Sequence, residues 1–542
     1  MSGLMLGFGE GMHNLFRSPI DVKSPSEASF VIADYYFSVS GNDATGNGSF
    51  YAPYQTIAKA NALIAASAGS KILAFKGGDT FNTTVSIFIN RPNITITSYG
   101  VGKAIIRTTA DVNAIGIYID DGVVFGKSVG TLTITNIELY GNGIAGTILS
   151  GLDVYADSVA AANYGTVIIN NVIAHDYGEN GIKVGSFSGT KGYLSVTISN
   201  CICYNNGRGI STYAQTGYAH ASVTFRSNIT YNNPGKGAFP TGLGISIGNA
   251  ISGLIENCVS YANGGSGAGG GYGVGVYFSS NVVIQNNESY NNTSTGPDGD
   301  GFDIDGGCTD CTLQYNYSHG NKGAGYLVYG NANGVNLRPV VRFNISINDG
   351  NVVSYGSILI GQENINGVTD AKIYNNSCYQ SNANGSCCEV VINGTGNFTN
   401  CIISNNVFYS QGGINLVRIN NLATVGILLV NNDYFGSTTS VNWLTVNYGT
   451  VAAWLAAIVT QEQILGTPKN LGIDPNWKFP SPPPTVNGYV PGLLLRYNLG
   501  ASNALRSAGL NVNSQYGWAI PANDYYGIAI AAATMPVGAS KN

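Results

Sequence analysis

Charged residues are scarce in this chain: only 10% of its 542 residues are Asp, Glu, Lys or Arg. The formal net charge of −5 leaves no basic field to neutralise phosphates, which argues against a nucleic-acid partner. No apolar run approaches the roughly 18 residues of a membrane-spanning helix, so we expect no membrane span. Residues 1–20 lack an early basic region, and Gly, Glu and His dilute their apolar positions. They do not resemble a secretion signal, which favours release by lysis or an unusual export route.

Cysteine is also infrequent, and the nine cysteines are an odd number. Cys308 and Cys311 form a CxxC motif, but no second pair follows at zinc-like spacing. We therefore predict that the cysteines are small buried apolar side chains rather than disulfides or metal ligands.

The chain is rich in Gly, with 74 residues, and in Tyr, with 34. A disordered chain would be charged and poor in aromatics, and a helical protein would be richer in Ala, Leu, Glu and Lys. Because so few residues are charged, Asn, Ser, Thr and Gly must supply the polar surface. This composition is typical of a β-rich protein.

A short phrase recurs along the chain from residues 198–206 to 429–437: an apolar residue, a polar or aromatic one, Asn or Cys, two more residues and an aromatic. Its anchor positions are separated by about 29 residues, which fits one coil of three short strands and three turns. The anchors are Val172, Cys201, Asn228, Cys258, Asn287, Asn316, Asn344, Asn376, Asn406 and Asn432. We predict an all-β fold, a single-stranded right-handed parallel β-helix. Inside it, stacked Asn amides satisfy one another from coil to coil.

The ends of such a solenoid need covers, because an open terminal coil is an aggregation edge. Residues 54–66 have helical periodicity, with Ile57, Ala60, Leu63 and Ile64 on one face, and are predicted to form an N-terminal cap helix. We divide the chain into an appendage (1–34), the cap helix and first coils (35–100), the central β-helix (101–440) and C-terminal coils with their cap (441–542).

Residues 35–43, 52–57 and 75–81 (YYFSVSGND, APYQTI and FKGGDTF) resemble the opening of secreted pectate-lyase-like β-helix proteins. Residues 451–456 and 492–502 are similar to the closing coils of that family. The family includes many polysaccharide lyases and hydrolases and also non-enzymes, so the resemblance implies a fold and a polysaccharide partner rather than one reaction.

Residues 1–34 fall outside this resemblance, and an unmatched N-terminal segment on a β-helix resembles phage tailspikes. That resemblance implies a homotrimer whose residues 1–34 dock on a tail adaptor. It also implies that the protein is located on the virion or is otherwise extracellular. A floppy leader or an atypical export signal is the alternative.

The densest acidic cluster lies at residues 296–307, GPDGDGFDIDGG. Aligning coils by the repeat matches residues 301–305 with strands at 181–185, 209–213, 244–248, 275–279 and 325–329. Phe302 and Ile304 then point inward, whereas Asp303 and Asp305 point outward, about 6.6 Å apart at Cα. This separation suits an inverting glycosidase, and crowding of like charges gives an acid and a base.

The sequence therefore predicts Asp303, Asp305 and Asp300 as candidate catalytic residues. The candidate substrate-binding residues on nearby coils are Tyr277, His319, Lys322, Arg208, Lys183 and Glu179. The aromatic position of His319 in the repeat also fits simple packing. The DGFDID phrase is similar to the Asp-bearing strands of polygalacturonase-type hydrolases. The Gly-His-Gly and Arg-x-Lys motifs of that family do not follow it in the usual order.

Three other interpretations stay open. No cofactor is required by the hydrolase interpretation, but Asp298, Asp300 and Asp303 also suit a calcium ion, and Lys322 or Lys183 would then be the base of a lyase. The cluster also fits a well-solvated turn. At the level of the whole protein, the leading hypothesis is a tailspike-like protein that binds a host surface polysaccharide, with or without depolymerising it. The alternatives are a secreted bacterial lyase or hydrolase and a non-catalytic adhesin or virion decoration protein.

Overall fold

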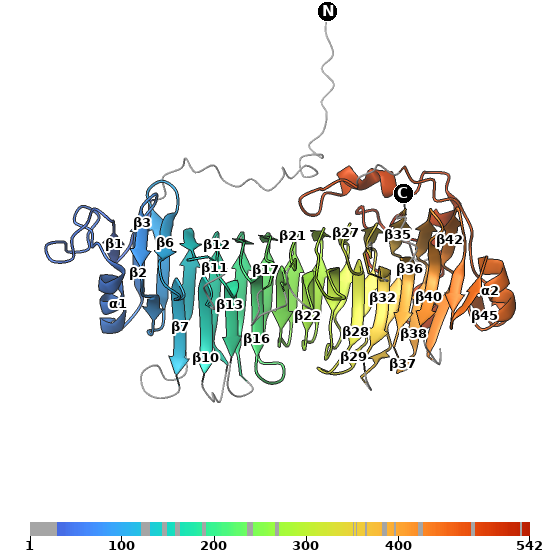
Figure 1. Ribbon diagram of the computed structural model, residues 1–542, viewed down its shortest axis with the longest axis horizontal. Coiled ribbons are helices and arrows are strands. Elements are labelled where there is room, and N and C mark those ends of the chain that lie inside the picture. The colour runs from blue at the N-terminus through green and yellow to red at the C-terminus, as the bar shows by residue number, and fades with distance from the viewer. Residues whose placement is uncertain are drawn as a thin grey trace, which may run out of the picture.

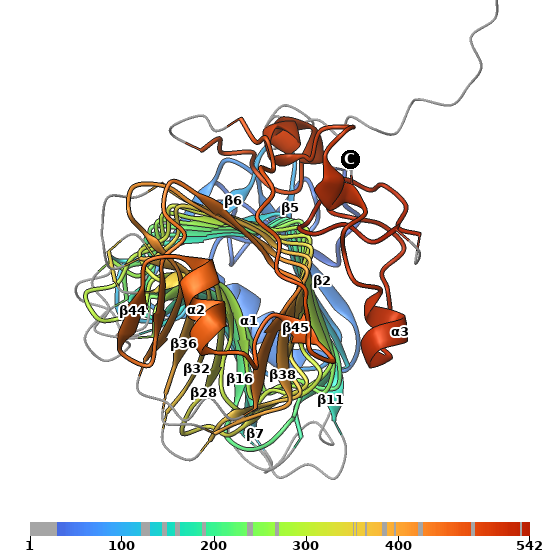
Figure 2. The same cartoon turned by 90° about the vertical axis from the view of Figure 1, so that its right-hand side faces the viewer.

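The computed structural model describes residues 30–120, 130–143, 149–157, 163–186, 191–235, 242–265, 270–350, 352–353, 355–363, 366–381, 387–394, 397–420, 426–478, 483–531 and 534–541. The described residues form a right-handed parallel β-helix, as predicted (Figure 1). Strands of successive coils lie side by side in three walls, seen along the solenoid axis in Figure 2. Apart from the β43–β44 hairpin, neighbouring strands in these walls pair in parallel.

Sheet I is the first wall. Its strands, in spatial order, are β1 (Tyr35–Phe37), β2 (Lys71–Lys76), β5 (Ile94–Tyr99), β8 (Thr131–Thr135), β11 (Tyr164–Asn170), β14 (Tyr193–Ser199), β17 (Val223–Arg226), β20 (Gly253–Glu256), β23 (Val282–Gln285), β26 (Thr312–Gln314), β30 (Val340–Arg342), β34 (Lys372–Tyr374), β38 (Cys401–Ser404) and β41 (Ile427–Val430).

Sheet II is the wall that holds the acidic cluster. Its strands are β4 (Ile87–Ile89), β7 (Ile115–Asp120), β10 (Leu152–Asp157), β13 (Asn180–Ser186), β16 (Arg208–Ala214), β19 (Ile245–Gly248), β22 (Tyr272–Tyr277), β25 (Asp300–Ile304), β28 (Tyr326–Gly330), β32 (Gly356–Gln362), β36 (Cys388–Asn393), β40 (Asn415–Asn420), β43 (Val441–Trp443) and β44 (Val446–Tyr448).

Sheet III completes each coil. Its strands are β3 (Thr80–Thr83), β6 (Ala104–Thr108), β9 (Ile137–Tyr140), β12 (Ile173–His175), β15 (Ile202–Tyr204), β18 (Ile229–Tyr231), β21 (Val259–Tyr261), β24 (Glu288–Tyr290), β27 (Tyr317–His319), β31 (Ile345–Ile347), β35 (Ser377–Gln380), β39 (Val407–Ser410) and β42 (Asp433–Gly436). A small extra sheet joins β29 (Asn336–Leu337), β33 (Val368–Thr369) and β37 (Phe398–Thr399).

Inward-facing side chains stack in columns because each coil repeats the register of the one before it. Ile182, Ile210, Ile245, Val274 and Phe302 occupy one column of sheet II, and all five are fully buried. The nine cysteines are buried and free, as predicted. The strand alternation therefore places one apolar core along the whole solenoid.

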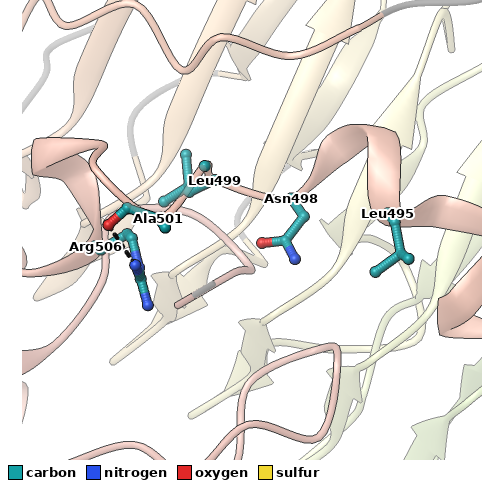
Figure 3. A pocket seen from close by; sticks show the side chains of 6 residues that line it. Leu495, Asn498, Leu499, Ala501 and Arg506 are labelled. Atoms are coloured by element: carbon teal, nitrogen blue, oxygen red, sulfur yellow. Dashed lines mark hydrogen bonds between the residues drawn. The ribbon is translucent and has the colours of Figure 1, made fainter.

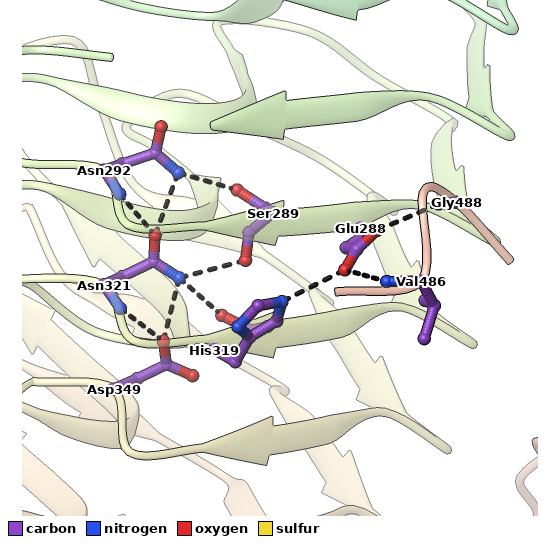
Figure 4. A network of polar contacts seen from close by, with 9 residues as sticks. Glu288, Ser289, Asn292, His319, Asn321, Asp349, Val486 and Gly488 are labelled. Carbon is purple, nitrogen blue, oxygen red and sulfur yellow. Dashed lines mark hydrogen bonds and ion pairs between the residues drawn. The ribbon is translucent and has the colours of Figure 1, made fainter. Parts of the chain in front are cut away.

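Two columns of buried amides stabilise the turns of the solenoid. In the predicted ladder, the Nδ2 of Asn287 donates to the Oδ1 of Asn316 at 3.0 Å, and Asn316 donates in the same way to Asn344 at 3.2 Å. A second ladder, which the sequence reasoning missed, runs parallel to it through Asn292 and Asn321 to Asp349 (Figure 4). Buried amides are costly unless paired, so each ladder fixes the register of successive coils.

In the frequent Asn-Asn pairs, the two neighbouring residues have different structural roles. Asn286 and Asn291, which precede Asn287 and Asn292, have φ of 59° and 53°. Asn tolerates this left-handed conformation better than most residues, so the first Asn turns the chain. The second Asn enters the ladder.

Helices cover both ends of the solenoid. Helix α1 (Ile57–Ala66) begins at Thr56, whose side chain accepts from the N–H of Lys59, and buries Ile57, Ala60 and Ile64 against the first coils. The predicted cap helix is therefore confirmed. At the other end, α2 (Val451–Ala457) packs Trp454 on Trp443 with ring centroids 5.0 Å apart.

The C-terminal region does more than close the last coil. After the hairpin of β45 (Gln463–Ile464) and β46 (Thr467–Pro468), the chain folds back along the outside of the solenoid (Figure 1). This arm, residues 471–541, contains η1 (Pro491–Tyr497), η2 (Ala504–Arg506) and α3 (Val512–Tyr516). It packs an apolar cluster on sheet III around Tyr317, Ile345 and Val407. The arm therefore covers the outer face of sheet III in the C-terminal half.

The arm is anchored where it reaches β24. The N–H groups of Val486 and Gly488 donate to the carboxylate of Glu288 at 2.8 and 3.0 Å, and His319 Nε2 lies 3.0 Å from the same group (Figure 4). Glu288 is fully buried beneath these contacts.

No helix in the described part of the chain is long and apolar enough to cross a membrane.

Candidate functional site

Asp303 lies on the outer side of β25, as the strand alternation predicts. Its neighbours Phe302 and Ile304 are fully buried in the core, whereas Asp303 pairs in register with Gly275 of β22 and Leu327 of β28. Asp305 follows directly after the strand and therefore shares the outer face with Asp303. The predicted inward positions of Phe302 and Ile304 are confirmed, and the alternation of the strand places the two carboxyls on the opposite side.

One detail of the predicted coil alignment is wrong. Gly275 rather than Tyr277 pairs with Asp303, so the strand that matches 301–305 is 273–277 and not 275–279. The sequence GYGVGVY repeats Gly-Val, and a shift by two residues keeps the same side chains inward. Hydrophobic alternation alone therefore cannot distinguish the two registers.

The environments of Asp303 and Asp305 differ. Asp303 is 3% exposed, and its Oδ1 has no hydrogen-bond partner among the described residues. Burial, together with the charges of Asp305, Asp300 and Asp298, raises the pKa of Asp303 well above its usual value. The Oδ1 of Asp305 accepts from the N–H of Gly306 at 2.8 Å and from Asn331 Nδ2 at 2.6 Å.

Burial raises the pKa of Asp305 as well, but only to about 6, because the hydrogen bond from Gly306 stabilises the ionised form. Burial and the neighbouring charges therefore favour the protonated form of Asp303, whereas Asp305, with a pKa of about 6, is largely ionised at neutral pH.

Asp300 and Asp298 complete the acidic cluster. Asp300 is the first residue of β25, is 1% exposed and accepts from the N–H of Ala324 in the next coil. Its other oxygen has no partner among the described residues, and burial with the charge of Asp298 raises its pKa well above the usual value. Burial also raises the pKa of Asp298, although Lys322 opposes the shift.

Lys322 organises the turn before β25. Its Nζ donates to the carbonyl oxygens of Ser294 and Gly296, the latter at 2.7 Å. In the described ranges, no three or more His, Cys, Asp or Glu side chains are grouped in a way that could hold a metal ion. Calcium at Asp298, Asp300 and Asp303 stays a prediction.

Two tyrosines of β22 flank the cluster. The hydroxyl of Tyr272 lies 2.7 Å from Ser246 Oγ, and the hydroxyl of Tyr277 donates to the carbonyl of Thr212 at 3.3 Å. The charges of Asp303 and Asp305 contribute to the raised pKa of Tyr272. Arg208 interacts electrostatically with Tyr277. The structure therefore brings Tyr277 and Arg208 to the face that holds the acidic residues.

Lys183 lies on β13 of the same sheet, several coils towards the N-terminus, and Glu179 directly precedes that strand. Lys183 Nζ is 2.7 Å from Glu179 Oε2 and 3.0 Å from Asp153 Oδ2. Burial lowers the pKa of Lys183, but the two carboxylates outweigh it, so the net shift is upward. Lys183 therefore stays protonated and ion-paired, which is unfavourable for a catalytic base.

Asp153 belongs to this group but was missed from the sequence. The strand GLDVY (151–155) has the same glycine-led alternation as GIKVG (181–185), and this similarity places Asp153 beside Lys183. The signal was present in the strand pattern.

His319 is not brought to this face. It lies in β27 of sheet III, is 3% exposed, and its ring stacks on Tyr290 with centroids 4.8 Å apart. Because His319 also contacts Glu288 beneath the arm, its place is in the packing of sheet III, the alternative considered for it above.

A pocket of about 310 Å³ is located on the arm, lined by Leu495, Asn498, Leu499, Gly500, Ala501 and Arg506 (Figure 3). The guanidinium of Arg506, its only charged lining group, donates to the carbonyls of Ala501 and Lys541. The pocket contains no carboxyl side chain that could act as an acid or base, so sheet II remains the candidate site.

Comparison with known proteins supports the β-helix fold. The family model described as "Right handed beta helix region" matches residues 240–339, which include the acidic cluster. No curated protein matches the chain significantly.

Several solved structures are similar at low identity. A GH136 lacto-N-biosidase from Eubacterium ramulus is 16% identical, with 73% of this chain and 67% of that chain covered and a TM-score of 0.41. XylC in complex with xylose is 10% identical (83% and 88% covered, TM-score 0.45), and pectate lyase Pel9A is 15% identical (94% and 96% covered, TM-score 0.38). Similarity at this level does not assign a reaction to the chain.

Proposed function

We propose that the chain binds a polysaccharide along the outer face of sheet II and hydrolyses it with Asp303 and Asp305. The observation that carries this proposal is the pair of carboxyls on one side of one strand, one with a strongly raised pKa and the other with a pKa of about 6. Two carboxyls in contrasting environments are what a glycosidase needs to hold one proton and accept another.

In this proposal, Asp303 donates its proton to the glycosidic oxygen, and Asp305 removes a proton from the attacking water. Residues two apart on a strand are about 6.6 Å apart at Cα, which leaves room for a water molecule beside the sugar. The expected reaction is therefore hydrolysis with inversion of the anomeric configuration.

A lyase reaction is less favoured by the same geometry. It would need a neutral base, and Lys183 is held protonated between Asp153 and Glu179. Lys322 points its ammonium group at two carbonyl oxygens.

Binding without cleavage is the second candidate function. Asp303 is only 3% exposed, so its proton is less accessible to a sugar than a surface carboxyl would be. A glycan-binding protein would use the tyrosines and Asp305 and would leave Asp303 as a buried acid. This candidate includes an adhesin and a virion decoration protein.

The biological setting that we propose is a tailspike-like receptor-binding protein, extracellular or on a virion, that acts on a host surface polysaccharide as a homotrimer. The support is the N-terminal segment 1–34, which the β-helix resemblance does not include; residues 1–29 lie outside the described residues. We expect light scattering to give the mass of three chains, and a stable monomer would contradict this setting.

Digestion of a polysaccharide panel tests the function itself. Capsular, neutral plant and uronate-containing polymers would be incubated with the full chain, and both new reducing ends and ultraviolet absorbance would be followed. New reducing ends without an unsaturated uronate are expected. Unsaturated uronate would establish a lyase instead, and binding without new ends would establish the second candidate.

The pH dependence of cleavage follows from the pair. Asp305 must be ionised to accept a proton, so kcat/KM should fall as the pH is lowered through about 6. The apparent value belongs to the pair, because the two carboxyls interact. A profile from pH 4 to 9 on the cleaved polymer checks this, and a rate that rises steadily towards pH 4 would contradict the assigned base.

A further inference from the structure

One column of sheet II alternates tyrosines with small or acidic residues from coil to coil. Tyr155 pairs with Gly185, which pairs with Tyr213; further along, Gly248 pairs with Tyr277. The same register places Asp305 between Tyr277 and Tyr329, and Tyr329 pairs with Gly361. The column in order is Tyr155, Gly185, Tyr213, Gly248, Tyr277, Asp305, Tyr329 and Gly361.

The glycines of this column leave room for the tyrosine rings. A Cβ at Gly185 would come within 2.1 Å of the Tyr213 ring, and one at Gly248 within 2.3 Å of the Tyr277 ring. A Cβ at Gly361 would come within 2.6 Å of the Tyr329 ring. Each of these three rings therefore lies across the neighbouring glycine, close to the sheet, instead of standing away from it.

The rings on either side of Asp305 lean away from it. Tyr277 covers Gly248 on the preceding coil, and its hydroxyl reaches Thr212 one coil further back. Tyr329 covers Gly361 on the following coil. Asp305 therefore occupies the gap between two aromatic platforms, and all four tyrosines of the column are half-buried, with part of each side chain open to solvent.

The spacing of the platforms sets a repeat. Neighbouring strands lie about 4.8 Å apart, so the rings of Tyr213 and Tyr277, which lean in the same direction, are about 10 Å apart. This matches two pyranose residues of an extended glycan. The rings of Tyr277 and Tyr329 lean in opposite directions, so the gap above Asp305 is wider. An aromatic face packs against the C–H face of a sugar.

We propose that Tyr155, Tyr213, Tyr277 and Tyr329 form a track for an extended glycan that runs parallel to the solenoid axis, with Tyr213 and Tyr277 two sugars apart and the bond to be cleaved in the wider gap above Asp305. The proposal rests on the function proposed above and adds the direction, length and chemical class of the ligand. The track extends over seven coils, which is six coil-to-coil spacings, so it accommodates about six sugar residues.

The charges around Asp305 define the class of sugar. Asp298, Asp300 and Asp303 crowd the same part of sheet II, and their mutual repulsion helps to raise the pKa values of Asp300 and Asp303. A sugar carboxylate placed here would be repelled by ionised Asp305. The two sugars that flank Asp305 are therefore neutral.

Binding measurements with oligosaccharides of two to eight residues test the track. The probes are xylo-, manno- and cello-oligosaccharides, with galacturono-oligosaccharides as the acidic series, titrated calorimetrically into the full chain. Wild-type affinity for a neutral series should rise in steps of two residues up to six. Tyr213→Ala should weaken hexasaccharide binding about 3- to 10-fold and disaccharide binding little, whereas Tyr213→Phe should keep the affinity.

The matched control is Tyr231→Ala. Tyr231 is also half-buried in a strand, but it stacks between Tyr204 and Tyr261 on sheet III. If the wild type binds while Tyr155→Ala and Tyr213→Ala behave like Tyr231→Ala, the track is overturned and the proposed function stands. Binding of the galacturonate series alone overturns the neutral class. If no series binds and no polymer of the panel is bound or cleaved, the proposed function fails and the track with it.

Discussion

Replacing Asp303 with Asn should lower kcat on the cleaved polysaccharide by about 10²- to 10⁴-fold, the usual contribution of a general acid. Asn has nearly the shape of a protonated Asp but cannot give up a proton to the leaving oxygen. Because burial favours the protonated, uncharged form of Asp303, we expect the substitution to change the charge of the folded protein little. We therefore expect binding and thermal stability to change little, so that the loss is confined to the chemical step.

Asp310→Asn is the matched control for this substitution. Asp310 is exposed, seven positions further along the chain, and is paired with Arg338 at 2.7 Å on the surface. Its replacement should leave kcat within a factor of two, since exposed ion pairs contribute only about 0–1 kcal/mol. Full cleavage by Asp303→Asn, measured as new reducing ends, would show that Asp303 is not the acid and would favour Asp305 or a site elsewhere.

Replacing Asn316 with Ala should lower the free energy of unfolding by about 3–5 kcal/mol. The amide of Asn316 donates to Asn344 Oδ1 at 3.2 Å and to the carbonyl of Ile284 at 2.9 Å. Its Oδ1 accepts from both the N–H and the Nδ2 of Asn287 at 3.1 and 3.0 Å. The substitution leaves several buried groups unpaired, and each costs about 1–3 kcal/mol.

Urea unfolding followed by circular dichroism measures this loss, with Asn291→Gly as the control. Asn291 is exposed and has φ of 53°, a conformation that Gly adopts without strain, so its replacement should change stability by less than about 1 kcal/mol. A solenoid can unfold in segments, and hydrogen exchange near Asn287 and Asn344 would locate the weakened coils. Equal losses in both variants would contradict the structural role of the ladder.

The fold was predictable because each coil carries the same residue type at the same position of the repeat. Asn228, Asn287 and Asn316 recur at one register, and this alone indicated a buried column. The cap helix at residues 57–66 was equally visible, since its apolar positions follow the helical period.

The second amide ladder was not predicted, although its residues lie in the same repeat as the first. Asn292 and Asn321 lie in the same repeated phrase, but one anchor per coil was sufficient to establish the period. The second Asn of each coil could then be taken for an ordinary turn residue. Only the structure shows that Asn321 donates to Asp349 and that this column, too, is buried.

The candidate site was predictable in part. Strand alternation placed Asp303 and Asp305 on the outer face, but it could not fix the register of β22, because a shift by two residues preserves the alternation. It also could not show that Asp303 is almost entirely covered, since exposure depends on neighbouring coils and turns.

The fold-back of the arm was not predictable from local patterns. The N–H groups of Val486 and Gly488 bind Glu288 about 200 residues away in sequence. Nothing in the sequence near Glu288 distinguishes a carboxylate that receives two backbone donors from one in water. Long-range contacts of this kind decide which faces stay open, and here they cover part of sheet III and leave sheet II as the candidate site.

A crystal structure of the Asp303→Asn variant with a bound neutral hexasaccharide, taken from the series that the wild type binds, tests the central claim most directly. The account predicts sugars stretched over the outer face of sheet II, with a glycosidic oxygen next to positions 303 and 305. A hexasaccharide bound instead on sheet III, or in the pocket beside Leu499 and Arg506, would contradict it.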